Sequence, residues 1–215
     1  GFILPFRPKP VAEKYHALWE EFGDSPLRLI TQGQVEKLRH LVEAQYGKGQ
    51  VLVDYVFAYG EPSLVNQIEK YRKLADKIVI LPLYPQYSCS TTAAFSDQLA
   101  KYQMSQRYIA DVQLIREYYA EPLFISALAQ SVEAFWQEHG RGDYLLMSYH
   151  GVPQAYADKG DPYQMQCLAT SEALAKALGL DATHTGSSFQ SRLGKAQWLQ
   201  PYTDVTVKAL AQKGI

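Results

Sequence analysis

Short apolar segments alternate with longer amphipathic segments along most of this chain, and no other feature restricts its fold as strongly. The apolar runs have strand length, and several are rich in β-branched or aromatic residues, as in Val51–Ala58 (VLVDYVFA). We expect strands at 51–58, 78–81, 112–115, 144–150 and, with weaker apolar character, 182–187.

The segments between these runs carry apolar residues at helical spacing. In 122–139, for example, Phe124, Leu128 and Val132 form one stripe, and Gly140 follows as a stop signal. We expect helices at 10–22, 34–46, 64–71, 93–103, 122–139, 162–178 and from 203 onward. Strands that alternate with helices predict an α/β fold with parallel sheets and right-handed crossovers.

The composition is that of an ordinary globular protein and excludes several classes. The 215 residues are 47% hydrophobic and 20% charged, with a net charge of −1. A nearly neutral chain gives no electrostatic argument for nucleic acid. No apolar run approaches the ~20 residues that a transmembrane helix needs. Cys89 and Cys167 do not suggest a disulfide scaffold, so we expect a reducing, cytoplasmic setting.

A histidine follows the apolar run that begins at Tyr144. His150 stands at the expected carboxyl end of this strand, before Gly151 and Pro153. Ligands of open α/β sheets bind at such strand ends, and histidine can ligate a metal or carry protons near neutral pH. The alternative is a structural histidine that hydrogen-bonds a loop carbonyl, and the histidine alone does not decide between the two.

A second strand end, after 78–81, carries closely spaced hydroxyl groups. Ser88, Ser90, Thr91 and Thr92 stand at the junction between this strand and the next helix. Such hydroxyls can cap the helix, or they can hold an anionic ligand together with the free N–H groups of its first turn. Both interpretations stay open, and the second would suit a phosphate-binding α/β domain.

Three long segments resemble one known family. LPLYPQYSCSTT (81–92), SYHGVPQAYADKGDPY (148–163) and FQSRLGKAQWLQPYTD (189–204) are similar to segments of proteobacterial ferrochelatases. Ferrochelatase inserts ferrous iron into protoporphyrin IX to make haem. The resemblance implies a chelatase-like fold of two Rossmann-like lobes, here 1–142 and 143–215, with a porphyrin cleft between them.

The resemblance also implies roles for particular residues. His150 falls on the family's strand-end histidine, which faces the porphyrin and is implicated in metal ligation and pyrrole deprotonation. Arg7 falls on a basic position that could pair with a porphyrin propionate. The other implied porphyrin contacts are Tyr59, Tyr84, Ser90, Thr91, Gln190 and Trp198.

The departures from the family concern both ends of the chain. Ferrochelatases have a further N-terminal strand, and a C-terminal third with a glutamate that works opposite the histidine. We therefore expect an internal piece with two incomplete lobes, inactive alone. Fe²⁺ is expected as a substrate, and no prosthetic group is expected. Cys89 matches an iron–sulfur ligand of some members, but the other ligands would lie in the C-terminal region, so we expect no cluster.

Other functions stay open beside the metal insertion that the resemblance implies. They are a related cobalt chelatase, a non-catalytic tetrapyrrole-binding module and the phosphate-binding domain mentioned above. Incomplete sheets would also leave strand edges exposed, so self-association is a further alternative. Peripheral contact with a membrane surface stays open as well.

Overall fold

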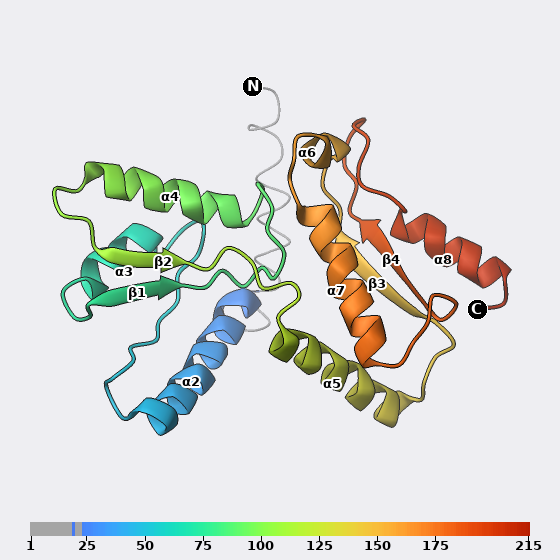
Figure 1. The fold of residues 1–215 in the computed structure, drawn as a ribbon, viewed down its shortest axis with the longest axis horizontal. Helices are drawn as coiled ribbons and strands as arrows, with labels where there is room; N and C mark the ends of the chain where they lie inside the picture. Colours follow the sequence, from blue (N-terminus) through green and yellow to red (C-terminus); the bar gives the residue numbers. More distant parts are fainter. Residues whose placement is uncertain (1–18, 20–22) are drawn as a thin grey trace. The chain divides into compact units, whose positions relative to one another are not determined.

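The computed structural model describes Trp19 and residues 23–215 (Figure 1). It divides into two compact units, one ending at Gln67 and the other comprising Ile68–Ile215, and each is described here by itself. Arg7 and, apart from Trp19, the helix expected at 10–22 lie outside the described residues.

From residue 23 onward, the first unit contains the long helix α2 (Pro26–Tyr46). The expected start at Gln34 was wrong by about two turns. The first N–H groups of a helix have no acceptor within it, so the missing N–H of proline costs nothing at the first position, and the φ of proline suits a helix. The Ser25–Pro26 step therefore begins the helix. The expected end was confirmed, because Gly47 follows Tyr46 with a φ of 93°.

Residues 51–58, expected as a strand, contain only the isolated parallel bridge between Phe57 and Ser63. The Arg39 guanidinium donates to the Val53 carbonyl oxygen at 3.0 Å, so a side chain takes the place of a neighbouring strand there. The strand prediction was therefore wrong. A β-rich composition produces a strand only where another strand offers a ladder, and the described part of this unit offers none.

The second unit begins within α3 (Leu64–Tyr71) and contains a first sheet of two parallel strands. Strand β1 (Lys77–Ile80) pairs with β2 (Asp111–Leu114), and α4 (Thr92–Ser105) connects them. Both strands confirm the expected positions within about a residue. A continuous apolar run is typical of a strand buried on both faces, yet Val79 on β1 is 57% exposed.

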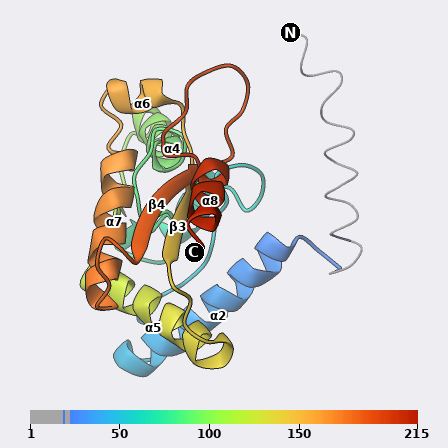
Figure 2. The ribbon, with the colours of Figure 1, turned by 90° about the vertical axis from the view of Figure 1, so that its right-hand side faces the viewer.

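The second sheet is also parallel. Strand β3 (Leu145–His150) pairs with β4 (Thr185–Gln190) in register along its whole length. Helices α7 and α8 lie on opposite sides of this sheet (Figures 1 and 2). The helices around the sheet are α5 (Pro122–His139), α6 (Gln154–Asp158), α7 (Tyr163–Ala177) and α8 (Thr203–Gln212).

Parallel sheets flanked by helices confirm the predicted α/β class. Helix α5 has the expected bounds. The strand expected at 182–187 is instead Thr185–Gln190, because its sequence TGSSFQ has little apolar pattern and its pairing with β3 sets its position. The five-residue α6 was not predicted, since it is too short to show a helical period. The lobe boundary expected between residues 142 and 143 stays a prediction.

Two clusters of buried side chains support the second sheet. Ala129 on α5 packs with Leu174 and Leu178 at the end of α7. The carboxyl ends of β3 and β4 rest on the other cluster, which consists of Val152, Cys167, Phe189 and Leu199. None of the helices in the described residues combines the length and apolarity that a bilayer crossing needs.

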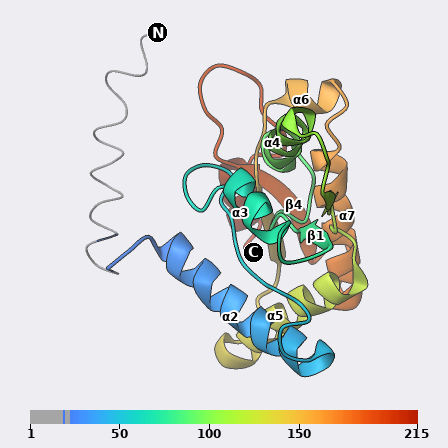
Figure 3. The same ribbon diagram turned by 90° about the vertical axis from the view of Figure 1, so that its left-hand side faces the viewer.

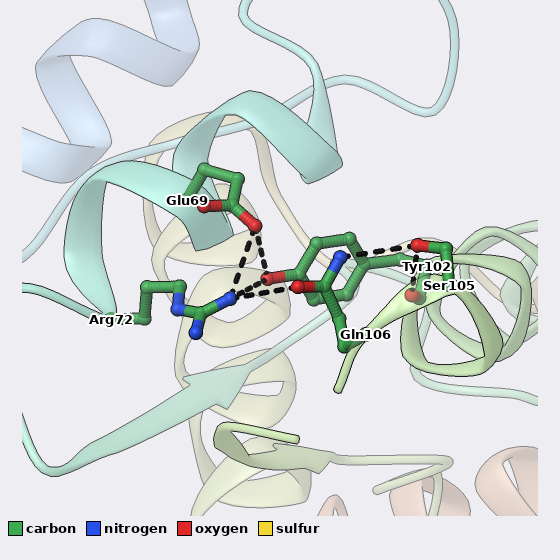
Figure 4. A network of polar contacts seen from close by, with 5 residues as sticks. All are labelled: Glu69, Arg72, Tyr102, Ser105 and Gln106. Atoms are coloured by element: carbon green, nitrogen blue, oxygen red, sulfur yellow. Dashed lines mark hydrogen bonds and ion pairs between the residues drawn. The ribbon is translucent and has the colours of Figure 1, made fainter. Parts of the chain in front are cut away.

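A polar network joins α3 to α4, which neighbour each other in Figure 3. Tyr102 is only 5% exposed, and its hydroxyl donates to Glu69 Oε1 at 2.6 Å (Figure 4). Arg72 Nη1 donates to the Tyr102 hydroxyl at 3.1 Å and to Gln106 Oε1 at 2.9 Å. The hydrogen bond from Tyr102, followed by the charge of Arg72, holds the pKa of Glu69 below its usual value.

Replacing Tyr102 with phenylalanine should lower the free energy of unfolding by about 1–2 kcal/mol, because the Glu69 carboxylate and the Arg72 guanidinium lose the hydroxyl that they share. Urea denaturation measures this change. Tyr108→Phe is the matched control, since Tyr108 is 79% exposed, and it should leave stability unchanged.

The same pair of variants gives a pH test. The native pKa of Glu69 is lowered, so its contribution is present above the unfolded pKa and is lost as the pH falls through the native pKa. The stability gap between the parent protein and Tyr102→Phe should therefore narrow in acid. A gap that stays constant down to unfolding would contradict this role of Glu69.

Candidate functional site

His150 and Gln190 occupy equivalent places at the carboxyl ends of neighbouring strands. They are register partners in the β3–β4 pair, and the Gly151 N–H donates to the Gln190 carbonyl oxygen at 2.7 Å. Trp198 joins them from a later loop, which forms an antiparallel bridge with Pro153. The structure thus brings together three of the residues that the sequence predicted for the site.

The ring of His150 has a defined tautomer. Its Nδ1 lies 2.8 Å from the Gly151 carbonyl oxygen, and a carbonyl oxygen can only accept. Nδ1 must therefore carry a proton, which leaves the lone pair of the neutral ring on Nε2. The residue is exposed, so this nitrogen is available to hold a metal ion or accept a proton. The loop-carbonyl contact expected of a structural histidine is present, and it also orients the ring.

Gly151 leaves room for the close approach of the three segments around His150. A Cβ at this position would lie 2.8 Å from the Gln190 carbonyl oxygen and 3.4 Å from Trp198 Cε3. The half-buried indole of Trp198 is fixed at its other end by an N–H donated to the Leu193 carbonyl oxygen at 2.9 Å. Trp198 therefore presents a held aromatic surface beside His150.

The buried cluster that contains Phe189 and Leu199 holds the neighbouring site residues in place. Phe189 and Leu199 are 1% and 0% exposed, and each is the chain neighbour of a site residue, Gln190 and Trp198 respectively. Cys167 lies in the same cluster, and burial raises the pKa of its thiol to about 12. Such a thiol stays protonated and contributes packing rather than reactivity.

The predicted residues Tyr84, Ser90 and Thr91 lie on the loop between β1 and α4, residues 81–91, which we call the β1 loop. Tyr84 and Ser90 are exposed and Thr91 is half-buried, so all three side chains are accessible. The backbone of the β1 loop is tied to α7, because its Tyr87 N–H donates to the buried Gln166 side chain at 2.7 Å.

The hydroxyl junction at the start of α4 is already occupied by a carboxylate. Asp161 Oδ2 accepts the Cys89 N–H at 2.7 Å and the fully buried Ser88 hydroxyl at 3.0 Å. Burial alone would raise the pKa of Asp161, but the hydrogen bonds from Cys89, Tyr163 and Ser88 outweigh it and lower the pKa. A phosphate at this junction would meet a negative charge, so the geometry disfavours the phosphate-binding alternative.

Two residues predicted for the site lie outside the second unit or outside the described residues. Tyr59 belongs to the first unit and is 83% exposed, and Arg7 lies outside the described residues. Conversely, sequence reasoning missed Asp161, Tyr163 and Gln166. The first two stand within the GDPY string of a recognised motif, but their partners are far away in the chain, so no local signal marks them.

His150 is the candidate metal ligand that the sequence predicted, and the described residues supply no complete ligand set. In residues 23–215 and Trp19, no group of three or more histidine, cysteine or carboxylate side chains is placed to hold a metal. Two surface cavities of about 440 and 290 Å³ lie in the second unit, and neither is lined by His150, Gln190 or Trp198.

The fold and site together define a class. Parallel strands with flanking helices end in an oriented histidine beside a fixed indole, which is the arrangement of an α/β enzyme with its site at the carboxyl edge of a sheet. The family model for ferrochelatase matches residues 1–215, so the chain belongs to the ferrochelatase family.

Curated relatives agree with the family match. The chain is 46% identical over 216 residues to a ferrochelatase of Vibrio cholerae serotype O1, covering 100% of the chain and 65% of that relative. It is 43% identical over 215 residues to a ferrochelatase of a Psychrobacter species, covering 100% and 63% respectively. For the ferrochelatase of Idiomarina loihiensis the identity is 45% and the coverage 100% and 59%. The chain therefore spans less than two thirds of these relatives' lengths.

Gly151→Ala should disturb the site without any change in its chemical groups. The new methyl group must push away the Gln190 carbonyl or the Trp198 ring, and such overpacking costs about 1–3 kcal/mol of unfolding free energy. Thermal denaturation and the fluorescence of Trp198 would report the change. Gly142→Ala is the control, because nothing lies within 4 Å of its Cβ position. Equal behaviour of the two variants would contradict the close packing at Gly151.

Proposed function

We propose that this protein, in the full length that its gene encodes, inserts Fe²⁺ into protoporphyrin IX to form protohaem. This reaction is the terminal step of haem biosynthesis. The observation that carries the proposal is His150, an exposed strand-end histidine with a fixed tautomer in a chain of the ferrochelatase family. The names of the relatives support the same activity.

Metal insertion requires that two pyrrole protons are removed and that the water on Fe²⁺ is replaced by ring nitrogens, and the site suits both requirements. Two pyrrole protons leave the porphyrin as one Fe²⁺ enters, so the reaction releases two protons. The Nε2 lone pair of His150 can take one of these protons, or it can hold the ion while water is replaced by ring nitrogens. Bending of the macrocycle exposes its nitrogen lone pairs, so a site that fits the bent ring favours the transition state.

The residues around His150 fit a flat, amphipathic ligand. We assign the macrocycle faces to Trp198 and Tyr84, whose aromatic surfaces are accessible. The polar groups of the porphyrin edge would meet the side chains of Gln190, Ser90 and Thr91. Two assignments rest on the family resemblance alone, namely Tyr59 as a porphyrin contact and Arg7 as a propionate partner.

Replacement of His150 with alanine should abolish metal insertion, by about a thousandfold or more, because it removes an oriented base and ligand. Porphyrin binding should remain measurable, since the surfaces of Trp198 and Tyr84 are left in place. The rate is followed by loss of porphyrin fluorescence with Fe²⁺, and binding by fluorescence titration without metal.

His40→Ala is the matched control for this experiment. His40 is exposed on α2 and should tolerate alanine without loss of turnover. Near-normal insertion by His150→Ala would refute the assigned role of His150. Loss of insertion in both variants would show that the effect is not specific to the strand-end histidine.

A non-catalytic tetrapyrrole-binding module is the second candidate, and one observation favours it for the 215-residue chain. In the described residues no group of three or more histidine, cysteine or carboxylate side chains is placed to hold a metal, so we infer that the chain alone binds porphyrin without completing insertion. Porphyrin fluorescence quenching without metal uptake would identify this state. A related cobalt chelatase is distinguished by comparing Co²⁺ with Fe²⁺ in the same assay.

We propose further that the protein needs no prosthetic group and works in the cytoplasm. Both cysteines are free thiols, Cys89 exposed and Cys167 buried, which suits a reducing compartment. We assign the two sheets to the family's Rossmann-like lobes, divided near residue 142. Self-association through open strand edges and peripheral membrane contact stay alternatives for solution measurements.

A further inference from the structure

Asp161 joins two segments of the candidate site that are far apart in the sequence. It lies on the loop between α6 and α7 and is half-buried. Its Oδ2 accepts the Cys89 N–H at 2.7 Å and the Ser88 hydroxyl at 3.0 Å, both on the β1 loop. Its Oδ1 accepts the Tyr163 N–H at 3.0 Å. The carboxylate thus uses both oxygens in one connection.

Tyr163 extends this connection to the strand-end histidine. Its hydroxyl donates to the backbone carbonyl oxygen of His150 at 2.9 Å. Burial, followed by the neighbouring thiol of Cys167, raises the pKa of Tyr163, so the hydroxyl remains a donor throughout the neutral range. Hydrogen bonds therefore link the β1 loop to Asp161, Asp161 to the backbone of Tyr163, and the Tyr163 hydroxyl to the backbone of His150.

Other contacts keep the β1 loop attached when Asp161 is changed. The buried Gln166 accepts the Tyr87 N–H at 2.7 Å and donates to Glu117 at 2.7 Å. Gln86 donates to Thr170 at 2.9 Å. These bonds hold the first half of the loop. The second half, which carries Ser90 and Thr91, is held to this region through Ser88 and Cys89 by Asp161.

We propose that Asp161 is a positioning residue for porphyrin, acting through the β1 loop and, by way of Tyr163, through His150. The proposal rests on the function proposed above. Asp161 sets how far Ser90 and Thr91 lie from the histidine, and this spacing must match one ligand that spans both. Both oxygens of its carboxylate accept hydrogen bonds from N–H and O–H donors, so Asp161 orders the loop without binding the ligand itself.

The test compares Asp161→Asn with Asp158→Asn in the protein of full encoded length. The asparagine of the first variant can present an NH₂ group where the Cys89 N–H needs an acceptor, so the second half of the loop should move. The KM for porphyrin should rise about tenfold, the effect of losing one charge-assisted hydrogen bond. The KM for Fe²⁺ should not change. Asp158 is exposed and its carboxylate accepts a hydrogen bond from Gln154 within α6, so its variant should match the parent.

Two further variants separate positioning from simple stability. Destabilisation would lower the active fraction and hence kcat, and it would leave the KM for porphyrin unchanged. Asp161→Glu keeps the carboxylate and should recover part of the porphyrin affinity. Tyr163→Phe removes only the hydroxyl bonded to His150 and should lower kcat more than it raises the KM for porphyrin.

Alkylation of Cys89 gives a readout that does not depend on activity. Burial, followed by the bond to and charge of Asp161, raises the pKa of this exposed thiol. In Asp161→Asn the midpoint pH for iodoacetamide reaction at Cys89, followed by peptide mass spectrometry, should fall. In Asp158→Asn it should not.

The outcomes are distinguishable. If the parent protein inserts metal and Asp161→Asn matches Asp158→Asn in the KM for porphyrin, the positioning role is overturned while the proposed function stands. A fall in kcat alone, without recovery in Asp161→Glu, also overturns it. If the parent protein of full encoded length does not insert Fe²⁺, the proposed function fails, and the positioning role fails with it.

Discussion

The parallel pairing of β3 with β4 is the constraint on which the rest of the site depends. Register along the whole pair places His150 opposite Gln190, and the chain leaves both strands at the same edge. Helices α7 and α8 lie on opposite sides of this sheet, yet the loops that lead to them meet at this edge, since the Leu199 N–H donates to the Val152 carbonyl oxygen at 3.0 Å. The first of these loops contains Gly151, whose lack of a side chain lets the Trp198 ring approach the histidine.

Hydrogen bonds connect the two sheets of the second unit in the region of the site. Gln166 and Asp161 are both placed by α7 or the loop before it, and both satisfy backbone N–H groups of the β1 loop. An unpaired polar group in such a position would be costly, so these bonds specify one arrangement of the loop. Through the Ser88 and Cys89 contacts, the Asp161 carboxylate lies at the start of α4.

His150 combines the structural and the functional alternatives that the sequence left open. Its contact with the Gly151 carbonyl is the bond expected of a structural histidine. The same bond fixes the proton on Nδ1 and turns Nε2 into the available base or ligand. A residue can therefore be held by its own loop and remain chemically active at its other nitrogen.

The sequence by itself determined the α/β class, the places of most helices and the strand-end position of His150, because hydrophobic period and stop signals such as Gly140 are local. It determined family membership through three long motifs. It did not determine that 51–58 lacks a ladder, nor where β4 begins, since TGSSFQ adopts a strand only against β3. Only the tertiary structure assigned Asp161 to Cys89, 72 residues away in the chain, and fixed the tautomer of His150. Both depend on hydrogen bonds whose partners meet only after the chain has folded, and no local pattern encodes such a meeting.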